Sequence, residues 1–164
     1  MGKKKITIKL DPNSISQAIR EIEAYKQELT RRCQQMVESL TREGAEIARL
    51  KVVEMGANYT GELVSSIEGY FSPSAGAGII RAGAWYAVFV EYGTGVVGAQ
   101  SPHPDPQGWS YDINGHGEDG WVYFNDRDQR WHRTSGFQSR PFMYETGKEL
   151  ERVCHRLVQE VFAH

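Results

Sequence analysis

The sequence predicts an α+β fold in which a long N-terminal helix and a C-terminal helix pack on one face of an antiparallel sheet built from two hairpins. Apolar residues recur at helical spacing over residues 14–55 and again over residues 141–163. Between them, residues 63–82 and 121–134 each contain two runs of β-branched and aromatic residues separated by a turn. Helices segregated from hairpins favour this class, and a chain of 164 residues fits a single domain.

The predicted N-terminal helix follows an arm, residues 1–13, and carries a coiled-coil-like stripe. Its first apolar positions lie seven residues apart: Ile15, Ile22, Leu29 and Met36. Asp11 and Pro12 are typical of a helix start. Near Gly44 the stripe shifts, which indicates either a kink at the glycine or the drift of a long helix against a seven-residue repeat. A continuous helix and a helix broken in two are both compatible with the pattern.

A short element and a long loop separate the two hairpins. In the first hairpin we expect the leading strand to begin at Leu63. The pattern over residues 84–93 fits a helix or a strand, and Gly93, which suits a helix C-cap, favours a short helix. Trp85 is expected to anchor this helix on the sheet. Residues 96–120 are rich in Gly, Pro, Ser and Asp, and loops of that length are usually functional or disordered.

Charge is unevenly distributed along the chain. Between residues 82 and 126 there is no Lys or Arg and every charged residue is acidic. A basic segment follows at once, with Asp128 as its one acidic residue: Arg127, Arg130, Arg133 and Arg140. An acidic segment beside a basic one can pair within one chain. It can equally pair head to tail between identical neighbours, which closes into a ring when the rotation allows. The formal net charge of −2 is atypical of a dedicated nucleic-acid binder.

Composition also indicates the cellular compartment in which the protein is expected. No run of about 18 apolar residues is present, so we expect no transmembrane helix and no membrane partner. The basic start of the chain lacks the apolar stretch of a secretory signal. Cys33 and Cys154 lie on apolar helix stripes and are interpreted as small buried residues in a reducing compartment, although a disulfide between the terminal helices stays open.

The loop and the second hairpin contain the side chains that chemistry would use: His103, Asp105, His116, Glu118, Asp119 and His132. They include the ligand types of a metal-dependent hydrolase or nuclease, but no established ligand spacing, nucleophile motif or phosphate-binding loop is present. We therefore expect no catalysis, no metal and no cofactor. Glu91 is the one carboxylate in an apolar segment. We expect it on the exposed side of the short helix or paired with an arginine, rather than acting as a general acid.

Aromatic residues gather in the same region: Trp109, Tyr111, Trp121, Tyr123, Phe124 and Trp131. With the nearby arginines they could stack nucleic-acid bases, so a nucleic-acid-binding module is a further hypothesis. Aromatic and Arg side chains are also enriched in protein–protein interfaces, and the adjacent acidic segment would repel phosphates. The protein-interface interpretation is therefore favoured.

Three short blocks resemble one family of tailed-bacteriophage proteins. Residues 57–67 (ANYTGELVSSI) are similar to its Thr-Gly-x-Leu-x-x-Ser-Ile signature, and residues 86–95 (YAVFVEYGTG) to its Tyr-Ala-x-x-Val-Glu-aromatic-Gly-Thr block. Residues 140–144 (RPFMY) resemble its x-Pro-Phe-Met/Leu block. The blocks follow the family order. These are the neck or tail-completion proteins of long-tailed phages, also described as minor tail components. Tyr59 stands where the family usually has an acidic residue.

The resemblance implies a structural virion protein without catalytic activity. It would form a ring, a hexamer by the resemblance, that joins the head connector to the tail, or alternatively a terminator ring at the tail end. It also implies a long N-terminal helix, an antiparallel sheet, a short helix over residues 84–93 and a C-terminal helix. The expected partners are copies of itself, the head connector or stopper, and the tail-terminator or tail-tube proteins. The particles would be made in the cytoplasm of a bacterial host.

Charge, aromatic content and the expected ring together predict where partners bind. The residues expected at subunit or partner interfaces are Glu91, Asp105, Trp109, Asp112, Glu118, Asp119, Arg127, Arg130, Trp131 and Arg133. Lys3, Lys4 and Lys5 of the arm are expected to approach DNA that passes through the lumen of the ring.

Overall fold

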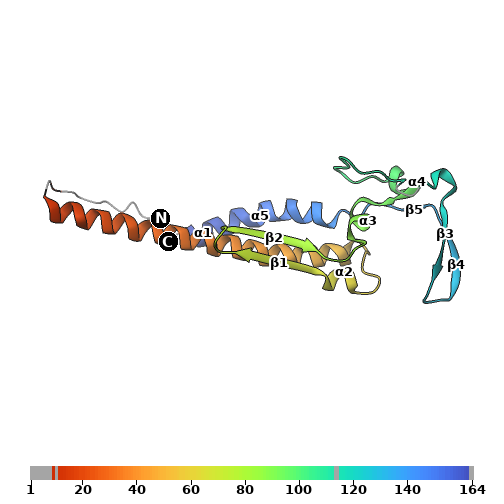
Figure 1. Cartoon of the computed structure of the whole chain (residues 1–164), viewed down its shortest axis with the longest axis horizontal. Helices are drawn as coiled ribbons and strands as arrows, with labels where there is room; N and C mark the ends of the chain where they lie inside the picture. The colour runs from red at the N-terminus through yellow and green to blue at the C-terminus, as the bar shows by residue number, and fades with distance from the viewer. Residues whose placement is uncertain (1–8, 10, 113–114, 163–164) are drawn as a thin grey trace.

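Two long helices lie side by side and dominate the structure (Figure 1). It is a computed structural model that describes residues 9, 11–112 and 115–162. α1 spans Pro12–Glu54 and α5 spans Phe142–Phe162, close to the predicted limits. The α+β class and the packing of long helices against antiparallel hairpins are confirmed. Most of the predicted arm, residues 1–13, falls outside the described residues.

α1 is one uninterrupted helix of 43 residues, about 65 Å long at 1.5 Å per residue. The Asp11 side chain accepts a hydrogen bond from Ser14 N–H at 2.9 Å and caps its first turn. Gly44 lies within the helix without breaking it. A Cβ at this position would lie 2.9 Å from Leu150 Cδ1 and would overlap Ile80, so close packing of α5 and the first hairpin explains the glycine.

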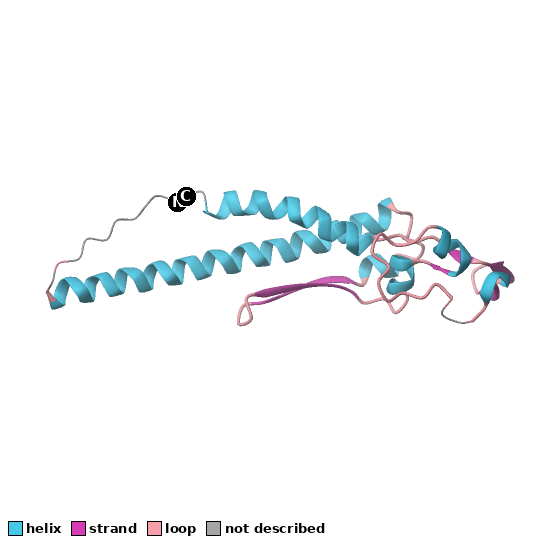
Figure 2. Ribbon diagram, turned by 90° about the horizontal axis from the view of Figure 1, so that it is seen from above, coloured by secondary structure: helices cyan, strands magenta, loops and turns pink. Residues whose placement is uncertain are grey.

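α5 runs back along α1 and ends before it reaches the N-terminal end of α1 (Figure 2). Arg32 Nη1 donates a hydrogen bond to Val161 O at 3.0 Å, near the end of α5. Further along, Arg156 forms an ion pair with Glu43. Leu157, which lies in the sequence between Arg156 and Val161, is buried. The N-terminal half of α1 therefore extends beyond the helix pair.

The first hairpin lies along α1 and consists of β1 (Ile67–Ser72) and β2 (Ala77–Ala82). Its antiparallel register runs from Ile67 opposite Ala82 to Ser72 opposite Ala77. Because β1 and β2 contact the same helix that α5 contacts, α1 is the common support of both.

A helical turn, α2 (Glu62–Ser65), precedes this hairpin. The prediction that the leading strand begins at Leu63 is therefore wrong. In a strand, Leu63, Ser65 and Ile67 would share one face, which would place a serine in the core. The helical turn instead buries Leu63 and Ile67 and leaves Ser65 exposed.

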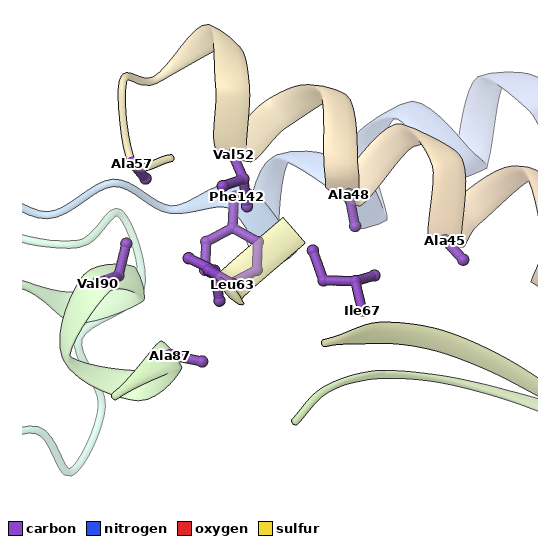
Figure 3. Packing of buried hydrophobic residues seen from close by; sticks show 9 residues of the cluster. All are labelled: Ala45, Ala48, Val52, Ala57, Leu63, Ile67, Ala87, Val90 and Phe142. Carbon is purple, nitrogen blue, oxygen red and sulfur yellow. The ribbon is translucent and has the colours of Figure 1, made fainter. Parts of the chain in front are cut away.

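The core lies where the C-terminal half of α1, α2, α3 (Ala87–Tyr92) and the start of α5 meet. Its buried apolar residues are Ala45, Ala48, Val52, Ala57, Leu63, Ile67, Ala87, Val90 and Phe142. Figure 3 shows the Phe142 ring between Val52 and Leu63. Full burial of a side chain of this size stabilises by about 3 kcal/mol. The core therefore fixes α3 against the start of α5.

Small elements follow α3: α4 (Gly95–Gln100), η1 (Gly117–Asp119), β3 (Trp121–Asn125), β4 (Arg130–Thr134) and β5 (Gly136–Phe137). The expectation of a continuous loop over residues 96–120 is wrong, because α4 and η1 occupy its two ends. Tertiary contacts hold α4: Val97 N–H donates to Ser135 O at 3.2 Å, and Thr94 pairs with Phe137.

β3 and β4 form the predicted second hairpin, with Trp121 opposite Thr134 and Asn125 opposite Arg130. The two hairpins nevertheless remain separate two-stranded sheets, so the single sheet predicted from them is wrong. Each hairpin pairs two strands that are adjacent in the sequence, and α3 and α4 lie between the two hairpins along the chain. The second hairpin lies at the end of the molecule opposite the N-terminal half of α1 (Figure 1).

Candidate functional site

Glu91 on α3 holds the start of α5. It is only 7% exposed. Its Oε2 accepts a hydrogen bond from Met143 N–H at 2.8 Å, and its Oε1 accepts one from Tyr144 N–H at 2.9 Å. The first N–H groups of a helix have no partner within it, and that helix end carries a partial positive charge, so a carboxylate is stabilised there. Glu91 therefore caps α5 from 52 residues earlier in the chain.

His103 ties the loop to the same carboxylate. Its Nε2 lies 3.1 Å from Glu91 Oε1, and the ring is buried. A carboxylate accepts hydrogen bonds, so Nε2 carries the proton. On the other side of the ring, Nδ1 lies 2.9 Å from Asp105 N and 2.8 Å from Asp105 O. Both ring nitrogens are therefore engaged inside the fold.

The segment before α5 makes backbone contacts with the end of α3. Ser139 Oγ donates to Glu91 O at 2.6 Å, and Arg140 N–H donates to Val90 O at 2.9 Å. Gly93, the predicted C-cap of α3, has φ 78°, and a Cβ there would lie 2.6 Å from Ser139 N. Only glycine combines this conformation with so close an approach.

Aromatic side chains attach the 101–112 segment to α3. The Trp109 ring stacks on Tyr92, with centroids 4.9 Å apart, and its Nε1–H donates to Gly93 O at 3.1 Å. Tyr111 OH accepts a hydrogen bond from His103 N–H at 3.1 Å. The beginning of the predicted loop is thus an anchored structure built around Glu91.

Two sequence-based expectations about α3 are wrong. Glu91 is buried, and its partners are His103 and two helix amides instead of an arginine. Trp85 does not anchor the helix on a sheet, because it is 79% exposed. Because apolar or aromatic residues flank Glu91 on both sides in the sequence, the pattern did not indicate which face of α3 is covered by α5. A carboxylate in an apolar segment, two residues before a glycine, was the available signal for a buried cap.

The other predicted interface residues lie mostly at the surface. Exposed are Asp105, Asp112, Glu118, Asp119, Arg127, Arg130, Trp131 and Arg133, whereas Trp109 is half-buried. They do not form one cluster: Arg127 lies 4.2 Å over the Tyr59 ring, and Asp112 accepts hydrogen bonds from backbone N–H groups of its own loop. Lys3, Lys4 and Lys5 lie outside the described residues.

Where the structure describes them, the acidic and basic segments do not pair with each other. In the described part of the chain, no ion pair joins an acidic residue of the 82–126 segment to Arg127, Arg130 or Arg133. Arg133 Nη2 donates to the backbone carbonyl of Asp119 at 2.7 Å, which leaves its charge without a carboxylate partner there. Glu91 is buried, but the exposed members of both charge sets stay available to a neighbour.

Two exposed apolar surfaces lie at opposite ends of the molecule. The α1 stripe consists of Ile15, Ile19, Ile22 and Leu29, which are 36–54% exposed on the N-terminal half of α1. The hairpin face consists of Val122, Phe124, Trp131 and Arg133 on one side of β3 and β4. Trp131 is 71% exposed, and its ring lies edge-on to Phe124. Apolar surfaces of this kind mark interaction sites.

The groups expected of a metal enzyme do not assemble. Among the residues that the structure describes, no group of three or more His, Cys, Asp and Glu side chains could hold a metal ion. His116 stacks on Trp121, away from the buried His103. Cys33 and Cys154 are both free, and Cys33 is exposed, contrary to expectation, because α5 ends near that level of α1. None of the helices in the described ranges is long and apolar enough to cross a membrane.

Comparison with protein-family models, curated proteins and solved structures gave no match to this chain. Function must therefore be inferred from the chain's own surfaces. These are the α1 stripe, the hairpin face and the unpaired charges on either side of residue 126. The Glu91 junction holds together the elements from which these surfaces project.

Proposed function

We propose that this chain is a structural subunit of a tailed-phage virion, a neck or tail-completion protein that assembles into a ring joining the head connector to the tail. The observation that carries the proposal is the pair of unlike apolar surfaces at opposite ends of one subunit, the α1 stripe and the hairpin face. A head-to-tail ring needs two different complementary surfaces on each subunit. Unpaired acidic and basic segments add charge complementarity to them.

The three blocks that resemble the phage family support the proposal because they meet in space. Leu63 of the first block, Val90 of the second and Phe142 of the third belong to one buried cluster. Glu91 of the second block caps the helix that the third block opens. The resemblance therefore concerns residues that build one common core.

The alternative of a tail-terminator ring uses the same surfaces and differs only in the partner that they meet. No observation favours a metal-dependent hydrolase that uses the loop histidines, because both ring nitrogens of His103 make hydrogen-bond contacts within the fold. The ring would be made in the host cytoplasm and would end in the virion. DNA in its lumen would meet the lysines of the arm.

The direct test is the mass of the protein in solution, by light scattering and native mass spectrometry, alone and with connector or tail-tube proteins. We expect a closed oligomer, six copies by the resemblance, alone or on the partner. Binding to purified tails but not to connectors would assign it to the tail end instead.

A variant of the hairpin face tests whether this surface forms the contact between subunits. The double variant Trp131→Ser with Arg133→Glu should shift the equilibrium toward monomer. Its matched control is Arg152→Glu, which reverses an exposed charge on α5. In the unaltered chain Arg152 pairs with the partly exposed Glu149, three residues earlier. A chain that stays monomeric and joins no particle would overturn the proposal, and so would equal effects of both variants.

A further inference from the structure

A cleft of about 460 Å³ lies beside the Glu91 junction. The turn after α1, α3 and the segment that leads into β3 form its walls. Aromatic rings line it: Tyr59, Trp85, Tyr86, Phe89, Tyr111 and Trp121. Its volume lies in the range of ligand-binding clefts, with room for a few side chains but not for a folded domain.

Two rings at the cleft are unusually exposed. Trp85 is 79% exposed and Tyr59 is 71% exposed. Trp85 stands edge-on to Tyr86 and Phe89, with centroids 5.6 and 6.2 Å apart, so its position is supported on one side only. Aromatic side chains of this kind are enriched where binding energy concentrates in protein interfaces.

Arg140 brings a cation without a carboxylate partner among the described residues to this largely apolar cleft. Its Nε is buried and has no hydrogen-bond partner, and its guanidinium forms no ion pair with any residue of the described ranges. Thr94 Oγ1, also in the lining, is likewise buried without a partner. The acid in the lining, Asp112, accepts hydrogen bonds from His116 N–H and Gly117 N–H at 2.8 and 3.1 Å. Buried polar atoms without partners are rare in native proteins and call for an explanation.

We propose that the cleft binds an extended peptide segment of a different protein, one that carries a carboxylate between apolar side chains. The carboxylate pairs with the Arg140 guanidinium, and the neighbouring apolar side chains pack on Trp85 and Tyr59. Arginine is suited to this recognition because its planar group binds a carboxylate through two parallel hydrogen bonds. The inference does not depend on the phage assignment.

A second copy of the chain does not offer such a segment within the described residues. Apart from Asp112, none of its exposed acids outside the helices stands between two apolar side chains. Glu68 and Asp105 stand beside Gly or Pro, Glu118 with Asp119 stands between glycines, and Asp126 and Asp128 flank Arg127 in the β3–β4 turn. Asp112 lines the cleft itself. The occupant is therefore a segment from another protein.

The test uses the full chain and two capped peptides, Leu-Asp-Leu-Phe and its Leu-Asn-Leu-Phe analogue, which differs only in the missing charge. Titration is followed by the NMR signals of Arg140 Nε–H and of the tryptophan indoles. We expect the acidic peptide to shift the signals of Arg140 and Trp85 and to bind at least tenfold more tightly than the analogue. A tenfold preference corresponds to about 1.4 kcal/mol.

Two variants separate the contribution of the Arg140 charge from that of the Trp85 ring. Arg140→Gln should abolish the preference for the acidic peptide, and Trp85→Ala should weaken both peptides equally. Trp131→Ala is the control, because it removes an equally exposed tryptophan that does not line the cleft. Equal affinity for both peptides, a preference that survives Arg140→Gln, or no binding at millimolar peptide would each overturn the inference. If Arg140→Gln does not fold, the peptide pair on the unaltered chain and on Trp85→Ala still decides it. Solution mass, measured on the same samples, reports on the proposed ring separately.

Discussion

Removing the Glu91 carboxylate should release α5 from α3. Glu91→Ala leaves three donors without their acceptor: Met143 N–H, Tyr144 N–H and His103 Nε2–H. A buried donor that loses its partner costs about 1–3 kcal/mol, but water can reach the helix end once the side chain is gone. We expect Glu91→Ala to lower the free energy of unfolding by about 4 kcal/mol. Glu91→Gln keeps one acceptor oxygen and should cost about 2 kcal/mol.

Urea unfolding followed by tryptophan fluorescence measures these changes, and hydrogen exchange locates them. The amides of Met143 and Tyr144 should lose protection before the rest of α5. Combining Glu91→Gln with His103→Ala should cost less than the sum of the single changes, by about 1–2 kcal/mol, because the two side chains share one interaction. The control, Glu118→Gln, alters an exposed carboxylate and should stay within about 0.5 kcal/mol. A Glu91→Ala chain as stable as the unaltered one, with both amides still protected, would refute the capping role.

Three further predictions concern stability. Gly93→Ala should cost about 3 kcal/mol in urea unfolding, because φ is 78° and the added carbon meets backbone; a loss below 1 kcal/mol would contradict this. Phe142→Ala should cost about 4 kcal/mol by the same measurement, and a loss no larger than that of an exposed alanine substitution would show that the ring is not central to the core. Hydrogen bonds from Arg31 and Arg32 lower the pKa of Glu28 to about 2. Since the folded pKa is depressed, this stabilisation is present above the ordinary value of 4.5 and lost as the pH falls toward 2; carboxyl NMR showing Glu28 titrating near 4.5 would disprove it.

Elements whose signal is local were predictable. The seven-residue spacing that begins at Ile15 indicated a long helix, and alternation between Trp121 and Asn125 indicated a strand with two unlike faces. Gly93 indicated the end of α3. In each case the periodicity or the backbone requirement belongs to neighbouring residues, so tertiary structure did not have to be known.

Features that depend on distant partners were not predictable. The burial of Glu91 is decided by amides 52 or more residues later. α4 is held by backbone contacts from residues 135–137, and its own sequence has no polar periodicity. The separation of the hairpins follows from how α3 and α4 place them. The sequence placed Arg140 in a basic segment and in the RPFMY block, but its unsatisfied Nε is a property of the assembled cleft.

The central claim, that this chain is a ring subunit between head and tail, is tested most directly by locating it in virions. Electron density of purified particles, with cross-linking mass spectrometry to assign the chain, is the measurement. We predict a ring of copies at the neck, with the hairpin face of one subunit cross-linked to its neighbour. Purified particles that lack the chain, or that hold it as single scattered copies away from the junction of head and tail, would contradict the claim.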